Sequence, residues 1–182
     1  MRNLKNKKND FLKIFITGGG SGIGKEVALS LFSMGYEVFV GVKFESEIAL
    51  FQKIIIQNPS KIHVFCCDIL QKNDREKISE LGIDILVCNA AIGTSGSVCE
   101  ISVDKIKEVF DTNVFAHLEC IQLVISDMIK RNKKGRIIII SSLTRSSAYS
   151  LFISLLCHKV FPRLFWILFK ARNEIIESLR RN

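Results

Sequence analysis

A glycine-rich turn near the N-terminus carries the clearest chemical signal in this chain of 182 residues. The turn reads Thr-Gly-Gly-Gly-Ser-Gly-Ile-Gly over residues 17–24, between a strand-like apolar run and an amphipathic helical pattern. Glycines suit such a turn because no Cβ blocks a positive φ or the close approach of the backbone to pyrophosphate oxygens. The N–H groups at the start of the following helix then face the anion. We therefore expect a dinucleotide to be bound by Thr17, Gly18, Gly20, Ser21, Gly22, Ile23 and Gly24.

The same turn has a second interpretation as a P-loop. Residues 19–25 fit that pattern up to Lys25, but the next position should be Ser or Thr to bind magnesium. Here it is Glu26, whose charge would repel the phosphates. The P-loop interpretation is therefore the weaker of the two.

Four further polar segments follow the turn in order along the chain. Cys67-Asp68-Ile69 and Asn89-Ala90-Ala91-Ile92-Gly93 each follow a strand-like run, Asp111-Thr112-Asn113-Val114 lies in a long helical pattern, and Ser141-Ser142 ends the last run. With the Thr-Gly-x-x-x-Gly-x-Gly turn, this ordered set resembles the short-chain dehydrogenase/reductase family of the classical type. Cys88 and Ala91 depart from the family's Asn-Asn-Ala-Gly turn.

The resemblance implies an NAD(P)-dependent oxidoreductase that transfers a hydride between a nicotinamide and a small-molecule carbonyl or alcohol. It implies that Asp68 and Ile69 contact the adenine, that Asn89 and Ala90 belong to the cofactor site, that the catalytic Asn113 steadies a water, and that the catalytic Ser142 hydrogen-bonds the substrate oxygen. Taken singly, Asp68 could be a strand-end cap, Asn113 a satisfied helix polar group and Ser142 a loop serine.

The resemblance also shows what this chain lacks. Hydride transfer needs a group that exchanges the proton of the reacting oxygen, and the family uses a tyrosine with a lysine four residues later. The lysine, Lys159, is present and is our third catalytic candidate, but Leu155 stands at the tyrosine position, and Tyr149 is followed four residues later by Ile153. We therefore expect impaired activity, with a non-catalytic nucleotide-binding remnant (a pseudoenzyme) as the alternative.

The segment after Arg145 suggests an origin for this defect. Shifting the reading frame by one base permits Tyr-Cys-Ala-Thr-Lys over residues 155–159, which resembles the family's active-site segment. We hypothesise a frameshift near Arg145 or Ser146. The family's greater length implies that the chain is also truncated at its C-terminal end.

The end of the second strand-like run bears on the choice of cofactor. An acidic side chain there would bind the ribose hydroxyls of NAD, and a cation would meet the 2′-phosphate of NADP. Val42 occupies the acidic position and Lys43 follows it. The pattern favours NADP, with NAD as the alternative, although Lys43 could also be a solvated strand-end lysine.

Alternating strands and helices must position these residues. Short, nearly continuous apolar runs predict strands covered on both faces at 12–17, 37–42, 61–67, 83–88 and 136–141. Helical patterns lie between them at 24–34, 46–57, 74–81 and 102–131. This alternation predicts an α/β fold with a doubly wound parallel sheet of the Rossmann type, incomplete at its C-terminal edge. We expect a single dinucleotide-binding domain over residues 1–182, with a basic tail at 1–10, a family-like part at 11–145 and a divergent tail at 146–182.

Composition narrows the class of protein. The net charge of +8 gathers at the two ends and in residues 130–136, with no nucleic-acid-reading motif, so we expect no nucleic-acid partner. The 6 cysteines show no metal-ligand spacing, which favours reduced thiols, no metal site and a cytoplasmic location. The apolar stretch 151–169 is interrupted by charges, so we expect no membrane span. The family forms homo-oligomers through the helix that is altered here, which puts oligomerisation of this chain in doubt.

Overall fold

The computed structural model describes residues 12–94 and 99–141. They fall into two compact units, one of residues up to Ala91 together with Phe115–Ile140, the other formed from Ile92–Val114 and residue 141. The expected single domain over the whole chain stays a prediction.

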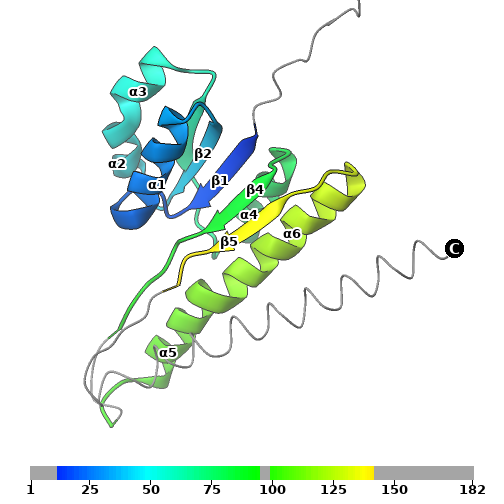
Figure 1. The fold of residues 1–182 in the computed structure, drawn as a ribbon. Coiled ribbons are helices and arrows are strands. Elements are labelled where there is room, and N and C mark those ends of the chain that lie inside the picture. Colours follow the sequence, from blue (N-terminus) through cyan, green and yellow to red (C-terminus); the bar gives the residue numbers. More distant parts are fainter. Residues whose placement is uncertain (1–11, 95–98, 142–182) are drawn as a thin grey trace, which may run out of the picture. The chain divides into compact units, whose positions relative to one another are not determined.

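The first unit contains a parallel sheet of five strands in the order β3-β2-β1-β4-β5 (Figure 1). The strands are β1 (Lys13–Thr17), β2 (Glu37–Val42), β3 (Ile62–Cys66), β4 (Ile85–Cys88) and β5 (Arg136–Ile139). Each lies inside a run predicted from the sequence, because β-branched and apolar residues fit a sheet that is covered on both faces. The doubly wound parallel sheet is confirmed. Its order reverses direction at β1 and β4, so the loops after these strands flank the crevice where such folds bind ligands.

Helices cover both faces of this sheet, as right-handed crossovers require. The β1–β2 and β2–β3 connections carry α1 (Gly22–Ser33), α2 (Glu45–Ile48), η1 (Ala49–Phe51) and α3 (Gln52–Gln57), and the other face carries α4 (Lys72–Glu80) and α6 (His117–Lys130) (Figure 1). The helix expected at 46–57 is thus divided by the 3₁₀ turn η1. That turn ends on Phe51, which is completely buried in the core.

The core under α1 is made largely of aliphatic side chains from neighbouring strands. Ile14 and Ile16 of β1 pack with Val38, Val40 and Val42 of β2, all at most 1% exposed, and with Ala28 of α1. Burying a side chain of this size stabilises a fold by roughly 1.5–3 kcal/mol. This core fixes the position of β1 and therefore the position of the glycine-rich turn that follows it.

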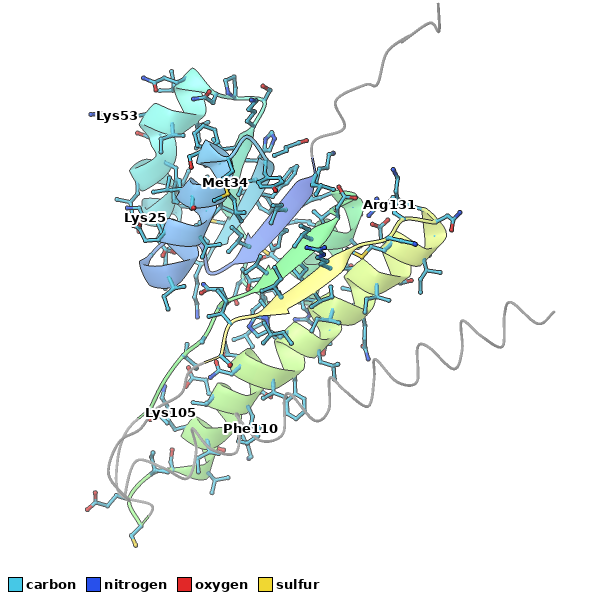
Figure 2. The ribbon with its side chains drawn as sticks, in the orientation of Figure 1. Lys25, Met34, Lys53, Lys105, Phe110 and Arg131 are labelled. Carbon is cyan, nitrogen blue, oxygen red and sulfur yellow. The ribbon has the colours of Figure 1, made fainter. Side chains whose placement is uncertain are left out.

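The amino ends of β1 and β4 are fastened by charged side chains. Asp84 accepts a hydrogen bond from the N–H of Lys13 through Oδ2 at 3.0 Å, and its Oδ1 lies 3.9 Å from Nη1 of Arg131. Arg131 follows α6 directly (Figure 2), bonds Asp127 at 2.7 Å and donates from Nη2 to the carbonyl of Ile83 at 2.6 Å. The side chains of Arg131 and Asp84 are 28% and 18% exposed, so this clamp is partly shielded from water.

Three cysteine thiols lie inside the first unit. Cys67 follows β3, Cys88 ends β4 and Cys120 belongs to α6, and each is at most 4% exposed. Burial raises the pKa of Cys67 and of Cys120 to about 12, and it also raises that of Cys88. These groups are unpaired thiols and remain protonated at neutral pH.

The second unit contains α5 (Val103–Phe110), whose first turn is capped by Ser102 accepting a hydrogen bond from the N–H of Lys105. A π-helical segment, η2 (Asp111–Ala116), follows along the chain. The sequence predicted one helix over 102–131, and the π-helical turns interrupt it. In the described ranges, 12–94 and 99–141, no helix combines the length and apolarity needed to cross a bilayer.

Candidate cofactor site

Thr17, the last residue of β1, joins the ends of β1 and β4. Its hydroxyl accepts hydrogen bonds from the N–H groups of Asn89 and Ala90 at 2.9 and 3.0 Å and donates to the carbonyl of Val87 at 3.4 Å. A hydroxyl offers one donor and two acceptor positions, so this side chain is fully used. Thr17 is 1% exposed, which makes each of these bonds costly to lose.

Asn89 adds a second bridge between the same two loops. Its Nδ2 donates to the carbonyls of Thr17 and Gly18 at 3.0 and 2.9 Å. Both amide hydrogens of Asn89 are therefore donated to backbone carbonyls of the glycine-rich turn. The side chain holds the turn in place, and this geometry gives it a positioning role.

The glycines allow this close approach. Gly18 has φ +62°, and a Cβ on it would lie 2.7 Å from Cα of Ala90. At Gly24 a Cβ would overlap the Asn89 amide and the Gly18 carbonyl. Real side chains do not approach so closely, so both positions require glycine for the two loops to meet.

The start of α1 leaves its backbone donors open. Ser21, the N-cap residue, makes no side-chain capping bond, and the first turn contains no acidic residue. The opposite holds for α5, where Ser102 caps the helix and Asp104 lies in the first turn. Uncapped N–H groups at the positive end of a twelve-residue helix suit an anion such as a pyrophosphate, so the residues present fit the cofactor that the turn predicts.

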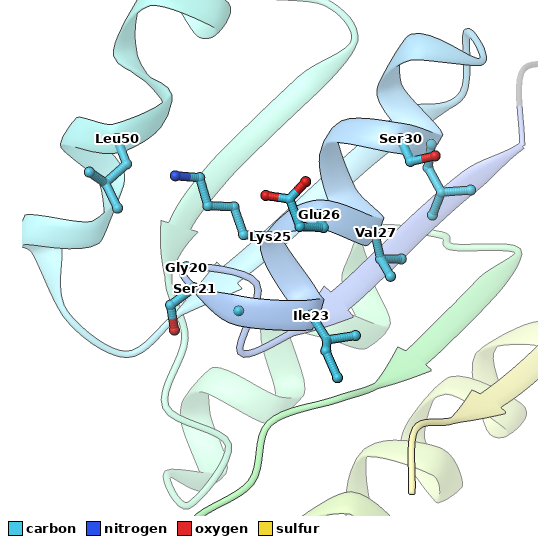
Figure 3. Close-up of a pocket in the computed structure, with 10 residues that line it drawn as sticks. Gly20, Ser21, Ile23, Lys25, Glu26, Val27, Ser30 and Leu50 are labelled. Carbon is cyan, nitrogen blue, oxygen red and sulfur yellow. The ribbon is translucent and has the colours of Figure 1, made fainter. Parts of the chain in front are cut away.

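An open groove of about 910 Å³ borders the turn on the side of α1 (Figure 3). It is lined by Gly20, Ser21 and Gly22 of the turn, by α1 residues and by Leu50 of η1. Figure 3 shows Lys25 extending from α1 toward Leu50. Ser21 is exposed at this groove, while Thr17 and Asn89 hold the turn through the hydrogen bonds described above.

The loop after β2 places a cation and a carboxylate near the turn. Lys43 is exposed, and its ammonium lies 5.8 Å from the centre of the Phe44 ring. Glu47 of α2 accepts hydrogen bonds from the N–H groups of Lys43 and Phe44 at 3.1 and 3.0 Å. A Cβ on Gly20 would overlap the Glu47 carboxylate, so this side chain lies directly over the glycine-rich turn. Sequence reasoning missed Glu47 because it stands five residues beyond the position expected to be acidic.

Asp68 lies just beyond the end of β3. Its Oδ1 accepts from the N–H of Leu70 at 3.0 Å, and its own N–H donates to Asp74 at 2.9 Å. This is the strand-end turn that the alternative interpretation proposed, and it leaves Oδ2 as the oxygen for an adenine contact. The adjacent Ile69 is buried, at 4% exposed. The adenine contacts of both residues stay predictions.

His117, in the first turn of α6, also reaches this end of the sheet. Its Nε2 lies 2.6 Å from the carbonyl of Ala90, and the side chain is buried. Burial lowers the pKa of His117, with the Ala90 hydrogen bond acting in the opposite sense, so the ring is neutral at pH 7. Its Nδ1 is buried without a hydrogen-bond partner among residues 12–94 and 99–141. A single histidine in an apolar helix gave no signal in the sequence.

Asn113 belongs to the second unit and lies in the π-helical segment η2. Its side-chain amide pairs with one residue on both edges, accepting from the N–H of Ile92 at 2.9 Å and donating to the Ile92 carbonyl at 2.8 Å. This is the satisfied polar group of the alternative interpretation, here within a π-helix, a form frequent at functional sites. The catalytic role of Asn113 stays a prediction.

The remaining predicted residues, Ser142 and Lys159, lie outside the described residues, as do Leu155 and Tyr149. The structure therefore brings together Thr17, Gly18, Gly24, Asn89 and Ala90 in the first unit. Asn113 belongs to the second unit.

Solved structures with similar folds include an actinorhodin polyketide ketoreductase variant with NADPH, at 25% identity and a TM-score of 0.73 over 83% of this chain and 61% of that one. Serine dehydrogenase from Escherichia coli shares the fold at 20% identity, with a TM-score of 0.74 over 88% of this chain and 75% of that one.

Curated proteins with similar sequences include two that are named as reductases. A diacetyl reductase of Staphylococcus epidermidis is 27% identical over 140 residues, 74% of this chain and 54% of the relative. A 3-oxoacyl-[acyl-carrier-protein] reductase of Rickettsia conorii is 32% identical over 130 residues, 70% of this chain and 52% of the relative. The chain thus spans about half the length of the curated relatives it matches.

The family model described as short chain dehydrogenase matches residues 13–157, which begins close to the expected family-like part at 11–145 and extends beyond it. Because this match covers most of the sequence and follows the ordered motifs and the sheet described above, the chain belongs to the short-chain dehydrogenase family.

Proposed function

We propose that this chain binds a nicotinamide dinucleotide at the glycine-rich turn and derives from an NAD(P)-dependent oxidoreductase acting on a small carbonyl or alcohol. The observation that carries the proposal is the network in which Thr17 and Asn89 join the ends of β1 and β4 beneath the uncapped start of α1. This network fixes the glycine-rich turn, whose backbone N–H groups would meet phosphate oxygens. When bound, the cofactor would supply the hydride acceptor or donor.

The chain's own catalytic residues are proposed from the family pattern. Ser142 would hold the substrate oxygen, Asn113 a water and Lys159 the proton path. Leu155 cannot exchange a proton, so we propose cofactor binding with impaired turnover. The alternative is a pseudoenzyme that holds the cofactor without turning it over.

Fluorescence titration of the purified full chain with NADPH and with NADH tests the binding. We expect a saturable change for at least one of them, and no oxidation of either with a panel of small ketones and aldehydes. Binding of neither cofactor would contradict the proposed site. Turnover by the unmodified chain would contradict the proposed impairment.

Two substitutions at one position test the missing proton donor. Leu155→Tyr should introduce measurable oxidation of the reduced cofactor, because it restores a phenol four residues before Lys159. Leu155→Phe is the matched control, since it adds the ring without the hydroxyl. Equal rates in both variants would remove the proton-donor explanation.

The finer predictions depend on single features. The preference for NADP over NAD comes from Lys43, an exposed cation next to β2, and Glu47 carries the opposite charge in the same loop. The cytoplasmic location and the absence of nucleic-acid and membrane partners depend on composition alone. They stay predictions, as does the oligomeric state.

A further inference from the structure

We propose that Glu47 selects the cofactor by its charge, accepting hydrogen bonds from ribose hydroxyls and repelling a 2′-phosphate, so that the site prefers NAD(H). This inference depends on the proposed cofactor site and names the residue that gives it specificity. It runs against the preference for NADP that Lys43 alone predicts.

The first step is the position of the Glu47 carboxylate. One oxygen, Oε2, receives the N–H groups of Lys43 and Phe44, the first two residues after β2. The side chain is half-buried, whereas the flanking Glu45 and Ser46 are exposed. Two backbone donors thus hold a carboxylate next to the carboxyl end of β2, where the last strand residue, Val42, is not acidic.

The second step is the contact with the glycine-rich turn. Oε1 of Glu47 lies so close to Gly20 that a Cβ there would overlap it, and Gly20 is buried. Gly20 also lines the groove through which a ligand reaches the turn (Figure 3). A carboxylate between this turn and the end of β2 occupies the place where doubly wound folds recognise the adenosine ribose.

The third step is the balance of charge. A carboxylate oxygen can accept from a ribose hydroxyl, but a 2′-phosphate would bring a second anion against it. The same phosphate would also compete for the N–H groups of Lys43 and Phe44, which Glu47 already uses. The ammonium of Lys43 lies 5.8 Å from the centre of the Phe44 ring at an exposed position, where salt and water screen its attraction for a phosphate.

The test is the ratio of the dissociation constants of NADPH and NADH for the full chain, measured by fluorescence titration. Glu47→Gln keeps an amide oxygen for the two N–H donors and removes the charge. We expect it to tighten NADPH roughly tenfold and to weaken NADH severalfold. Glu45→Gln makes the same change of charge two residues earlier at an exposed position and should leave the ratio within about twofold.

Gly20→Ala provides an independent variant. Its methyl group would displace the Glu47 carboxylate without removing it, so the ratio should shift in the same direction as in Glu47→Gln while both affinities fall. Equal ratios in Glu47→Gln and Glu45→Gln would overturn the proposal.

A measurement on the unmodified chain requires no variant to fold. Salt screens exposed charges, so raising the ionic strength should lower the NADPH-to-NADH ratio of dissociation constants if Glu47 repels the 2′-phosphate. A ratio that rises with salt would show that Lys43 dominates and would overturn the proposal. Binding of neither cofactor would overturn the proposed function together with this inference, whereas binding at a ratio that Glu47→Gln leaves unchanged overturns the inference alone.

Discussion

The two ends of the parallel sheet are fastened by different chemistry. At the carboxyl end, neutral groups join β1 to β4: the Thr17 hydroxyl, the Asn89 amide and backbone N–H and carbonyl groups. At the amino end, the link is a clamp of charged side chains in which Asp84 meets Arg131. Both ends hold the same pair of strands together.

This difference in chemistry assigns ligand binding to the carboxyl end of the sheet and a contribution to fold stability to the amino end. The network between β1 and β4 is neutral and adds no charge beside the start of α1, whose partial positive charge can attract an anion. A carboxylate within this network would compete with such a ligand. At the amino end such charges can stabilise the fold without this conflict, so substitutions at the two ends should have separable effects.

The largest effect is expected for Gly18→Val. The substitution forces a β-branched residue to φ +62° and drives its Cβ into Ala90. We expect a loss of about 3–6 kcal/mol in the free energy of unfolding, from backbone strain and overlap together, and no detectable cofactor binding. Urea denaturation and fluorescence titration measure the two.

Gly35→Val is the matched control for this change. Gly35 has φ +89°, but a Cβ there would meet nothing within 4 Å. It should cost about 1–3 kcal/mol through backbone strain alone and leave cofactor affinity unchanged. If the two variants lose affinity equally, the contact between Gly18 and Ala90 has no part in binding.

Thr17→Val should be the next most damaging change. The side chain keeps its shape but leaves the N–H groups of Asn89 and Ala90 without their acceptor in a buried site. We expect about 2–4 kcal/mol of destabilisation and a weaker affinity for the cofactor. Thr17→Ser keeps the hydroxyl and should retain most of both. A Val variant as stable as the Ser variant would show that these bonds contribute little.

Asp84→Asn tests the amino end. The amide can still accept from the N–H of Lys13, but the charge facing Arg131 is lost. We expect about 1 kcal/mol of destabilisation, with the dissociation constant of the cofactor unchanged within about twofold. A fall in affinity as large as that in Thr17→Val would contradict the separation between the two ends.

The smallest effect is a dependence on pH at the carboxyl end. Burial lowers the pKa of His117 in the folded chain, whereas the unfolded chain protonates this group near its ordinary value of 6.5. The unfolded state therefore binds more protons below that pH, and stability is lost as the pH falls through 6.5.

Urea denaturation at pH 7.5, 6.5 and 5.5 should show this slope in the unmodified chain. His117→Gln should reduce the slope. An identical slope in both proteins would remove the assignment to His117.

Much of the fold could be predicted because it depends on local pattern. Each strand lies within two residues of its predicted bounds, since β-branched runs mark buried strands directly. The glycine-rich turn was predicted for the same reason, because close approach leaves glycine as the suitable residue.

The contacts of Glu47 and His117 could not be predicted in this way. The reach of Glu47 to Gly20 depends on the path of the short helix α2 after β2, and that of His117 on the π-helical turns before α6. Neither path has a periodic signature in the sequence. A charged or polar residue can be counted from the sequence, but the group it meets depends on these irregular turns.

The chemical reactivity of the three buried thiols can also report local opening of the fold. Cys67, Cys88 and Cys120 come from the loop after β3, from β4 and from α6. With pKa values of about 12, Cys67 and Cys120 react with an aromatic disulfide only after the layer between sheet and helix opens. Their labelling rates would therefore report how often this layer opens, and equal rates for the two would indicate that it opens as one cooperative unit.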